Sequence, residues 1–187
     1  MGAREETTRR RGRPSPLHSL ATRTIALIAL SGKLIAVGTL VALFLALLVN
    51  VVLRYAVGSG IAWAYEIHAL LLPWLVGAGI LIAASRGGNI AITLLPDQMG
   101  PGARRILLIG IEAIILLIAL SVLESSRPIL KASTFQTLST LGIKQIWGYS
   151  ALVYAFVGMS VIALLEILRL LTSEAGEDID FGRSSLS

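Results

Sequence analysis

Four long apolar runs, separated by short polar segments, dominate the sequence from residue 34 to residue 168. The runs over 34–53, 67–85 and 145–165 contain no Asp, Glu, Lys or Arg, and the run over 106–123 contains only Glu112. A helix needs about 20 apolar residues to cross a hydrocarbon core of about 30 Å. The period-two alternation that is typical of a membrane barrel is absent. The pattern therefore predicts four transmembrane helices, over residues 34–53, 63–85, 106–123 and 147–168.

Composition agrees with a membrane location. Hydrophobic residues make up 55% of the 187 positions and charged residues only 14%, and the mean hydropathy is +0.81. Any one run is also compatible with a buried helix of a soluble protein, but four such helices would leave almost no chain to cover them. We expect an all-α membrane protein with a basic tail over 1–33, a four-helix transmembrane domain over 34–171 and a polar, mobile tail over 172–187.

The positions of the cations predict an orientation. With both termini in the cytoplasm, twelve Lys and Arg residues lie inside and four lie outside, which the positive-inside rule favours. The basic residues near the N-terminus lack the interleaved aromatics of a nucleic-acid-binding arm, so we expect no nucleic-acid partner. Residues 20–31 mix apolar residues with Arg23, and we predict an interfacial helix there, ahead of the first span.

Charged and aromatic residues gather between the first two apolar runs. Arg54 follows the first run, and Glu66 opens the second. Arg54 is compatible with a snorkelling anchor and Glu66 with a favourable charge at a helix N-terminus. However, Trp63, Glu66 and Trp74 have the spacing of one helix face. A stripe with a carboxylate and two indoles indicates contact with a protein partner.

The remaining polar residues inside the spans have simpler interpretations. Glu112 lies about 10 Å along the helix from Arg105, and a charge at that depth is usually buried against a partner. Glu166 and Arg169 are spaced for a surface ion pair. The Gly79 and Ala83 pair allows close helix contact, and we predict packing within the chain, with contact to another subunit as the alternative.

Motifs for catalysis and for metal binding were also sought. The sequence has no cysteine, and His68 is a histidine without further ligands nearby. No phosphate-binding glycine loop or nucleophile motif is present. We expect a protein that is not an enzyme and that holds no cofactor or metal.

Four stretches of the sequence form a recognisable set: NVVLRY at 50–55, GSGIAWAYEI at 58–67, PWLVGAGILIAASRGGNI at 73–90 and LGI at 141–143. Together they resemble the small membrane subunit of TRAP transporters, the DctQ-like family. That family ends its first span with Asn-x-x-x-Arg-Tyr, continues with a Trp and an acidic pair, and later has an Arg-x-x-His-Ile element. Here the acidic pair is reduced to Tyr65 and Glu66, the family histidine is replaced by Asn89, and Lys144 stands where a proline is common.

The resemblance implies a non-catalytic subunit in the bacterial inner membrane. Its expected partners are the lipid bilayer, a large TRAP membrane subunit that moves solute and sodium, and a periplasmic solute-binding protein that captures an organic acid. The residues expected at the contact with the large subunit are Arg54, Trp63, Glu66, Trp74 and Glu112.

Two questions stay open from the sequence. Arg127, Lys131 and Lys144 are compatible with docking of the binding protein and equally with ordinary interfacial cations. Arg54 and Glu66 are compatible with pairing to each other or to the partner. A homo-oligomeric channel or exporter, with Glu112 inside a pore, is the alternative function.

Overall fold

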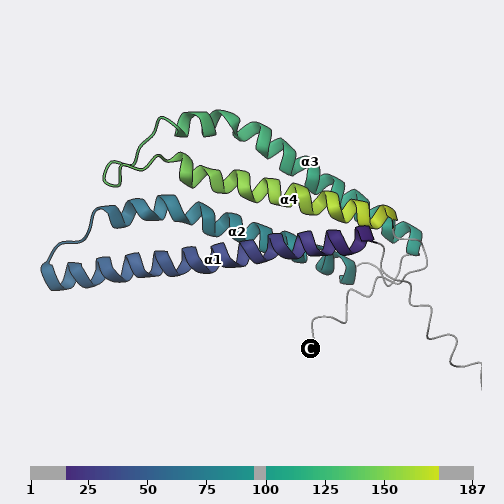
Figure 1. Cartoon of the computed structure of the whole chain (residues 1–187), viewed down its shortest axis with the longest axis horizontal. Helices are drawn as coiled ribbons and strands as arrows, with labels where there is room; N and C mark the ends of the chain where they lie inside the picture. The colour runs from purple at the N-terminus through teal and green to yellow at the C-terminus, as the bar shows by residue number, and fades with distance from the viewer. Residues whose placement is uncertain (1–15, 95–99, 173–187) are drawn as a thin grey trace, which may run out of the picture.

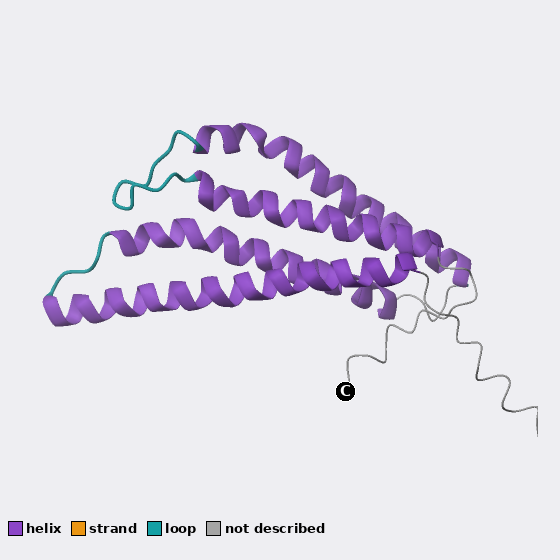
Figure 2. Cartoon of the chain, viewed as in Figure 1, coloured by secondary structure: helices purple, strands orange, loops and turns teal. Residues whose placement is uncertain are grey.

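The computed structural model describes residues 16–94 and 100–172, and these residues form four long helices. No strand occurs in this part of the chain, and loops join the first helix to the second and the third to the fourth (Figure 2). The prediction of an all-α fold is therefore confirmed. Of the predicted tails over 1–33 and 172–187, residues 1–15 and 173–187 lie outside the described residues, and residues 16–33 are helical. The helices are α1 (Pro16–Val57), α2 (Trp63–Leu94), α3 (Pro101–Ser133) and α4 (Ile146–Thr172).

The helices form two antiparallel hairpins, α1–α2 and α3–α4, which lie side by side (Figure 1). The loops of both hairpins, 58–62 and 134–145, lie at the same end of the molecule, which we call the hairpin end. The opposite end, where α1 begins and α4 ends, is called the terminal end. Helix α2 packs against α1 and α4, and α4 packs against α3 on its other side. The joint between the hairpins is therefore the α2–α4 contact.

Glycines bring the helices of this joint close together. A Cβ atom at Gly77 would lie 2.9 Å from the carbonyl oxygen of Ala151 on α4, and one at Gly148 would lie 3.1 Å from that of Ala69. Small residues allow such backbone approach between membrane helices. The prediction that Gly79 and Ala83 pack helices together within the chain is wrong. Both residues lie on an exposed face of α2, and no atom lies within 4 Å of a Cβ built at Gly79.

A small apolar core joins three helices in the half of the molecule nearer the terminal end. Ile25 of α1, Leu81 of α2 and Ile162 of α4 are buried together. Next to this core, the hydroxyl groups of Ser31 and Tyr154 are hydrogen-bonded at 2.7 Å. These contacts hold α1 and α4 to α2 independently of the hairpin end.

All four helices are long and apolar enough to cross a membrane, over 19–57, 63–86, 102–133 and 146–172. Each predicted span lies inside one of them, but the helices extend well beyond the apolar runs. Residues 20–31 are a continuous part of α1 and not a separate helix. Helix α3 continues through Pro128 to Ser133, so Arg127 and Lys131 lie on a helix and not in a loop.

Candidate interaction site at the hairpin end

Asn50 holds the loop of the first hairpin in place. Its side chain is only 5% exposed, and its Oδ1 accepts a hydrogen bond of 2.7 Å from the backbone N–H of Ile61. A Cβ at Gly60 would approach Oδ1 to 2.9 Å, and Gly58 has a φ of +80°. The glycines let the loop close tightly over the amide oxygen. From the sequence, Asn50 was identified only as part of a family motif. An asparagine near the end of an apolar run, ahead of a glycine-containing loop, is the signal that could have predicted this cap.

Glu66 binds the loop of the other hairpin. Both of its carboxylate oxygens accept hydrogen bonds from the N–H of Thr140, each at 2.9 Å, and Oε2 also accepts one of 2.8 Å from Leu141. Arg54 is exposed in the last turn of α1 and forms no ion pair with Glu66. The partner of this carboxylate is therefore a set of backbone amides that lies more than seventy positions further along the chain.

Trp74 also contacts the second hairpin. Its Nε1–H donates to the carbonyl oxygen of Trp147 at 2.8 Å, and its ring lies 5.6 Å from that of Tyr154, tilted by 37°. Trp74 and Glu66 together hold one face of α2 against α4 and against the 134–145 loop that precedes α4. The common face expected from the spacing thus contacts the chain's own second hairpin, while Trp63, at the start of α2, is 36% exposed.

Exposed aromatic side chains surround the hairpin end. Such residues are enriched where a membrane protein crosses from lipid to water. Tyr55 and Tyr65 are exposed at the helix ends of the first hairpin, and Trp63 lies next to Tyr65 in the sequence. Phe135 and Trp147 are exposed in the second hairpin. This distribution is typical of a belt at one membrane–water boundary.

The structure brings the three predicted docking cations to this same end. Arg127 and Lys131 lie on the last turns of α3, and Lys144 lies in the loop before α4. All three are exposed. Arg127 is paired with Glu124 at 2.6 Å, so part of its charge is compensated within the chain.

A second group of charges lies toward the terminal end, between α3 and α4. Glu166 and Arg169 form the predicted ion pair at 2.7 Å, but it is not a surface pair, since their side chains are only 21% and 14% exposed. The charge of Glu166 lies within electrostatic reach of the half-buried Glu112. Arg105 of α3 donates to the carbonyl oxygen of Leu171 at 2.7 Å. These groups connect α3 to α4.

Possible metal ligands do not cluster in the described part of the chain. It contains no group of three His, Cys, Asp or Glu side chains that is placed to hold a metal ion. The Nδ1–H of His68 donates to the carbonyl oxygen of Ala64, one turn earlier in α2, at 2.6 Å.

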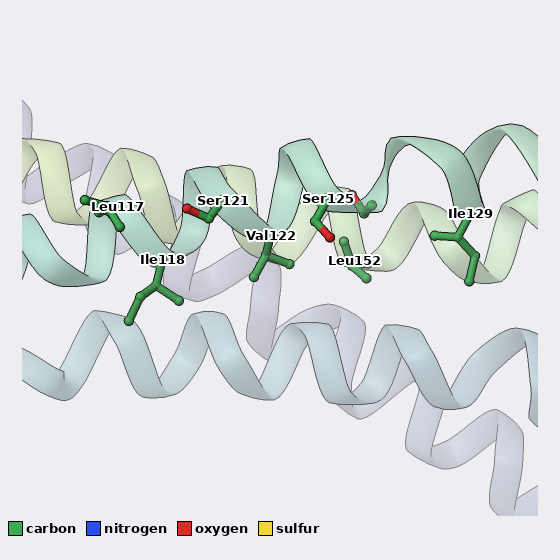
Figure 3. Close-up of a pocket in the computed structure, with 8 residues that line it drawn as sticks. Leu117, Ile118, Ser121, Val122, Ser125, Ile129 and Leu152 are labelled. Carbon is green, nitrogen blue, oxygen red and sulfur yellow. The ribbon is translucent and has the colours of Figure 1, made fainter.

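A shallow hollow of about 510 Å³ lies along α3. Figure 3 shows Ile118 and Val122 pointing from α3 toward the ribbon of α2, with Leu152 of α4 nearby. The lining is mostly aliphatic, and the hydroxyl of Ser126 donates to the carbonyl oxygen of Leu123 in its own helix. The hollow suits an apolar group better than a charged solute.

Comparison with known proteins gives consistent matches. Residues 43–173 match the family described as tripartite ATP-independent periplasmic transporters, DctQ component. The chain is 26% identical to a putative TRAP transporter small permease protein of Haemophilus influenzae, over 73% of the chain and 84% of that protein. It is also 32% identical to an uncharacterized protein, y4mM, of Sinorhizobium fredii, over 47% of the chain but only 16% of that much longer protein.

Proposed function

The chain belongs to the DctQ family of tripartite ATP-independent periplasmic transporters, and from this premise we propose that it is a small permease subunit that braces a large transport subunit and carries no solute itself. The large subunit would move the solute, driven by sodium, and a separate periplasmic protein would deliver it. An organic acid is the proposed class of solute. These roles are what membership of the family implies.

One observation carries the proposal. The buried polar side chains of the described residues each bond to backbone groups near them. Asn50 accepts from Ile61, Ser126 and Ser133 donate to carbonyl groups three residues earlier, and Ser160 donates to one four residues earlier. These four side chains therefore hold the fold. A solute path through the bundle would need a connected set of polar groups that are free to coordinate the solute, and the buried Nε2 of His68, which has no hydrogen-bond partner, does not form such a set by itself.

We place the hairpin end at the periplasmic side and both termini in the cytoplasm of a bacterium, with the chain in its inner membrane. The excess of cations toward the termini supports this orientation. The exposed aromatic belt then lies at the outer membrane–water boundary, and Lys131 and Lys144 face the periplasm. In this position they would meet acidic groups of a docking binding protein.

The contact with the large subunit is proposed to include Arg54 and Trp63, which are exposed at the hairpin end. Glu66 and Trp74 would act indirectly, since they fix the second hairpin against the first. Glu112, which is half-buried on α3, would contribute to this contact only indirectly, from inside the bundle.

Co-purification tests the proposal. A tag on this chain should recover a large polytopic membrane protein in mild detergent, and Arg54→Ala combined with Trp63→Ala should recover several-fold less of it. Trp147→Ala is the matched control, because it removes an exposed indole at the same end from the other hairpin. Recovery of this chain only as a homo-oligomer that conducts ions would favour the channel alternative and overturn the proposal.

A further inference from the structure

Glu66 links the first hairpin to the tip of the second through three hydrogen bonds. The carboxylate comes from the first turn of α2, and the donors are the backbone amides of Thr140 and Leu141. At the hairpin end, the other side-chain hydrogen bond between the hairpins is that of Trp74. Trp74 bonds to the start of α4 and does not touch the loop tip through this bond. Glu66 is therefore the residue that connects the loop itself to α2.

The loop over 134–145 is folded by its own backbone, independently of Glu66. The N–H of Leu138 donates to the carbonyl oxygen of Ile143 at 2.9 Å, and that of Gly142 donates back to Leu138 at 2.8 Å. Thr137 and Lys144 form an isolated β-bridge, and Gly142 has a φ of +65°. The base of the loop is thus closed by backbone bonds, and its tip is fastened by Glu66.

The negative charge of Glu66 is matched by these amides and not by a cation. Neither ion pair of the described residues includes this carboxylate. Hydrogen bonds to an ionised acceptor are about twice as strong as neutral ones. A glutamine at this position would keep one acceptor oxygen for the two N–H groups but would lose the negative charge, so its bonds to the loop would be weaker. The strength of the link to the loop therefore depends on the charge of the carboxylate.

We propose that Glu66 is a latch that holds the 134–145 loop against α2, and that the loop moves away from α2 when the carboxylate is removed. The helices stay packed without it, because Gly77 against Ala151 and Ser31 against Tyr154 join them deeper in the bundle. Glu66 is in this sense a positioning residue for the loop. The inference concerns this chain alone and goes beyond its proposed role as a bracing subunit.

The absence of cysteine in the sequence allows a direct test in the full-length protein. Spin labels at Tyr55→Cys on α1 and Ser139→Cys at the tip of the loop, both exposed positions, report the distance between the first hairpin and the loop tip. In lipid nanodiscs, we expect one narrow distance distribution with Glu66 and a broad one, shifted to longer distances, with Glu66→Gln. Glu124→Gln is the matched control and should leave the distribution narrow, since Glu124 is bonded only to the neighbouring Arg127 in an exposed pair.

A second measurement separates a latch from a general loss of folding. The midpoint of thermal unfolding should change little in Glu66→Gln, and backbone amide exchange at Thr140 and Leu141 should become about tenfold faster or more, as the loss of hydrogen bonds to a charged group predicts. An unchanged distance distribution in a folded Glu66→Gln variant would overturn the proposal. If that variant does not fold, the unsubstituted protein decides: protected amides at Thr140 and Leu141 support the latch, and unprotected ones refute it.

Discussion

Gly77 and Gly79 lie two residues apart on α2 and have opposite environments. A Cβ at Gly77 would meet the backbone of Ala151, whereas one at Gly79 would meet no atom within 4 Å. The contact at Gly77 is with backbone, so it cannot be relieved by the rotation of a side chain. The close approach of α2 and α4 therefore depends on one glycine and not on the other.

This difference gives a prediction for stability. Gly77→Ala should lower the free energy of unfolding by about 1–3 kcal/mol, the usual cost of overpacking. Gly79→Ala should be neutral or raise it by up to about 1 kcal/mol, because alanine favours the helix. Reversible unfolding in mixed micelles, followed by circular dichroism, measures both variants. Equal losses in the two would contradict the α2–α4 packing described above.

The sequence could not distinguish these glycines. Both lie in the same apolar run, and which one faces α4 depends on the order of the helices in the bundle. The same limit applies to Glu66. Its spacing with Trp74 predicted a common face, but the donors to its carboxylate lie in a loop more than seventy residues away. Local patterns predicted which side chains share a face and could not predict what that face contacts.

At the scale of the elements, the apolar runs predicted the number and order of the helices but not their lengths. Polar residues such as Arg23 and Lys33 suggested a break before the first span, yet α1 runs continuously for 42 residues, which corresponds to about 63 Å. Helical backbone bonds tolerate occasional charged side chains at the surface. The predicted span boundaries therefore mark where the hydrophobicity falls, and the helices continue beyond them.

A helix of this length leads to a prediction about its place in the bilayer. Single cysteines at exposed positions of α1 should react with a water-soluble maleimide up to about Lys33 and become protected from residue 34 to residue 53, since a hydrocarbon core of about 30 Å holds about 20 residues. The labelling yield in native membranes measures this boundary. Protection that begins near Leu20 would show instead that α1 is strongly tilted and embedded for most of its length.

At the scale of the whole molecule, the two ends differ in character. The hairpin end carries exposed aromatics, exposed cations and two loops fixed by Asn50 and Glu66. Toward the terminal end, the ion pair of Glu166 and Arg169 is largely buried between helices, whereas Arg23 and Arg86 are exposed. The exposed aromatics and the two fixed loops, and not exposed cations as such, therefore distinguish the hairpin end.

Docking at that end can be tested by charge reversal. Lys131→Glu combined with Lys144→Glu should raise, several-fold, the concentration of binding protein needed for half-maximal uptake, because complementary charge mainly accelerates encounter. The maximal rate should change little, and the effect should shrink at high salt. Arg23→Glu, an exposed cation on α1 far from this end, is the control. An unchanged requirement for binding protein in the double variant would remove the docking role.

We propose that this subunit braces a transporter and conducts nothing itself. The most direct test is uptake into proteoliposomes under a sodium gradient, with this chain, the large subunit and the binding protein supplied singly and together. We expect uptake only when all three are present, and no flux of solute or ions through this chain alone. Flux through this chain alone, or full uptake by the large subunit and binding protein without it, would contradict the account.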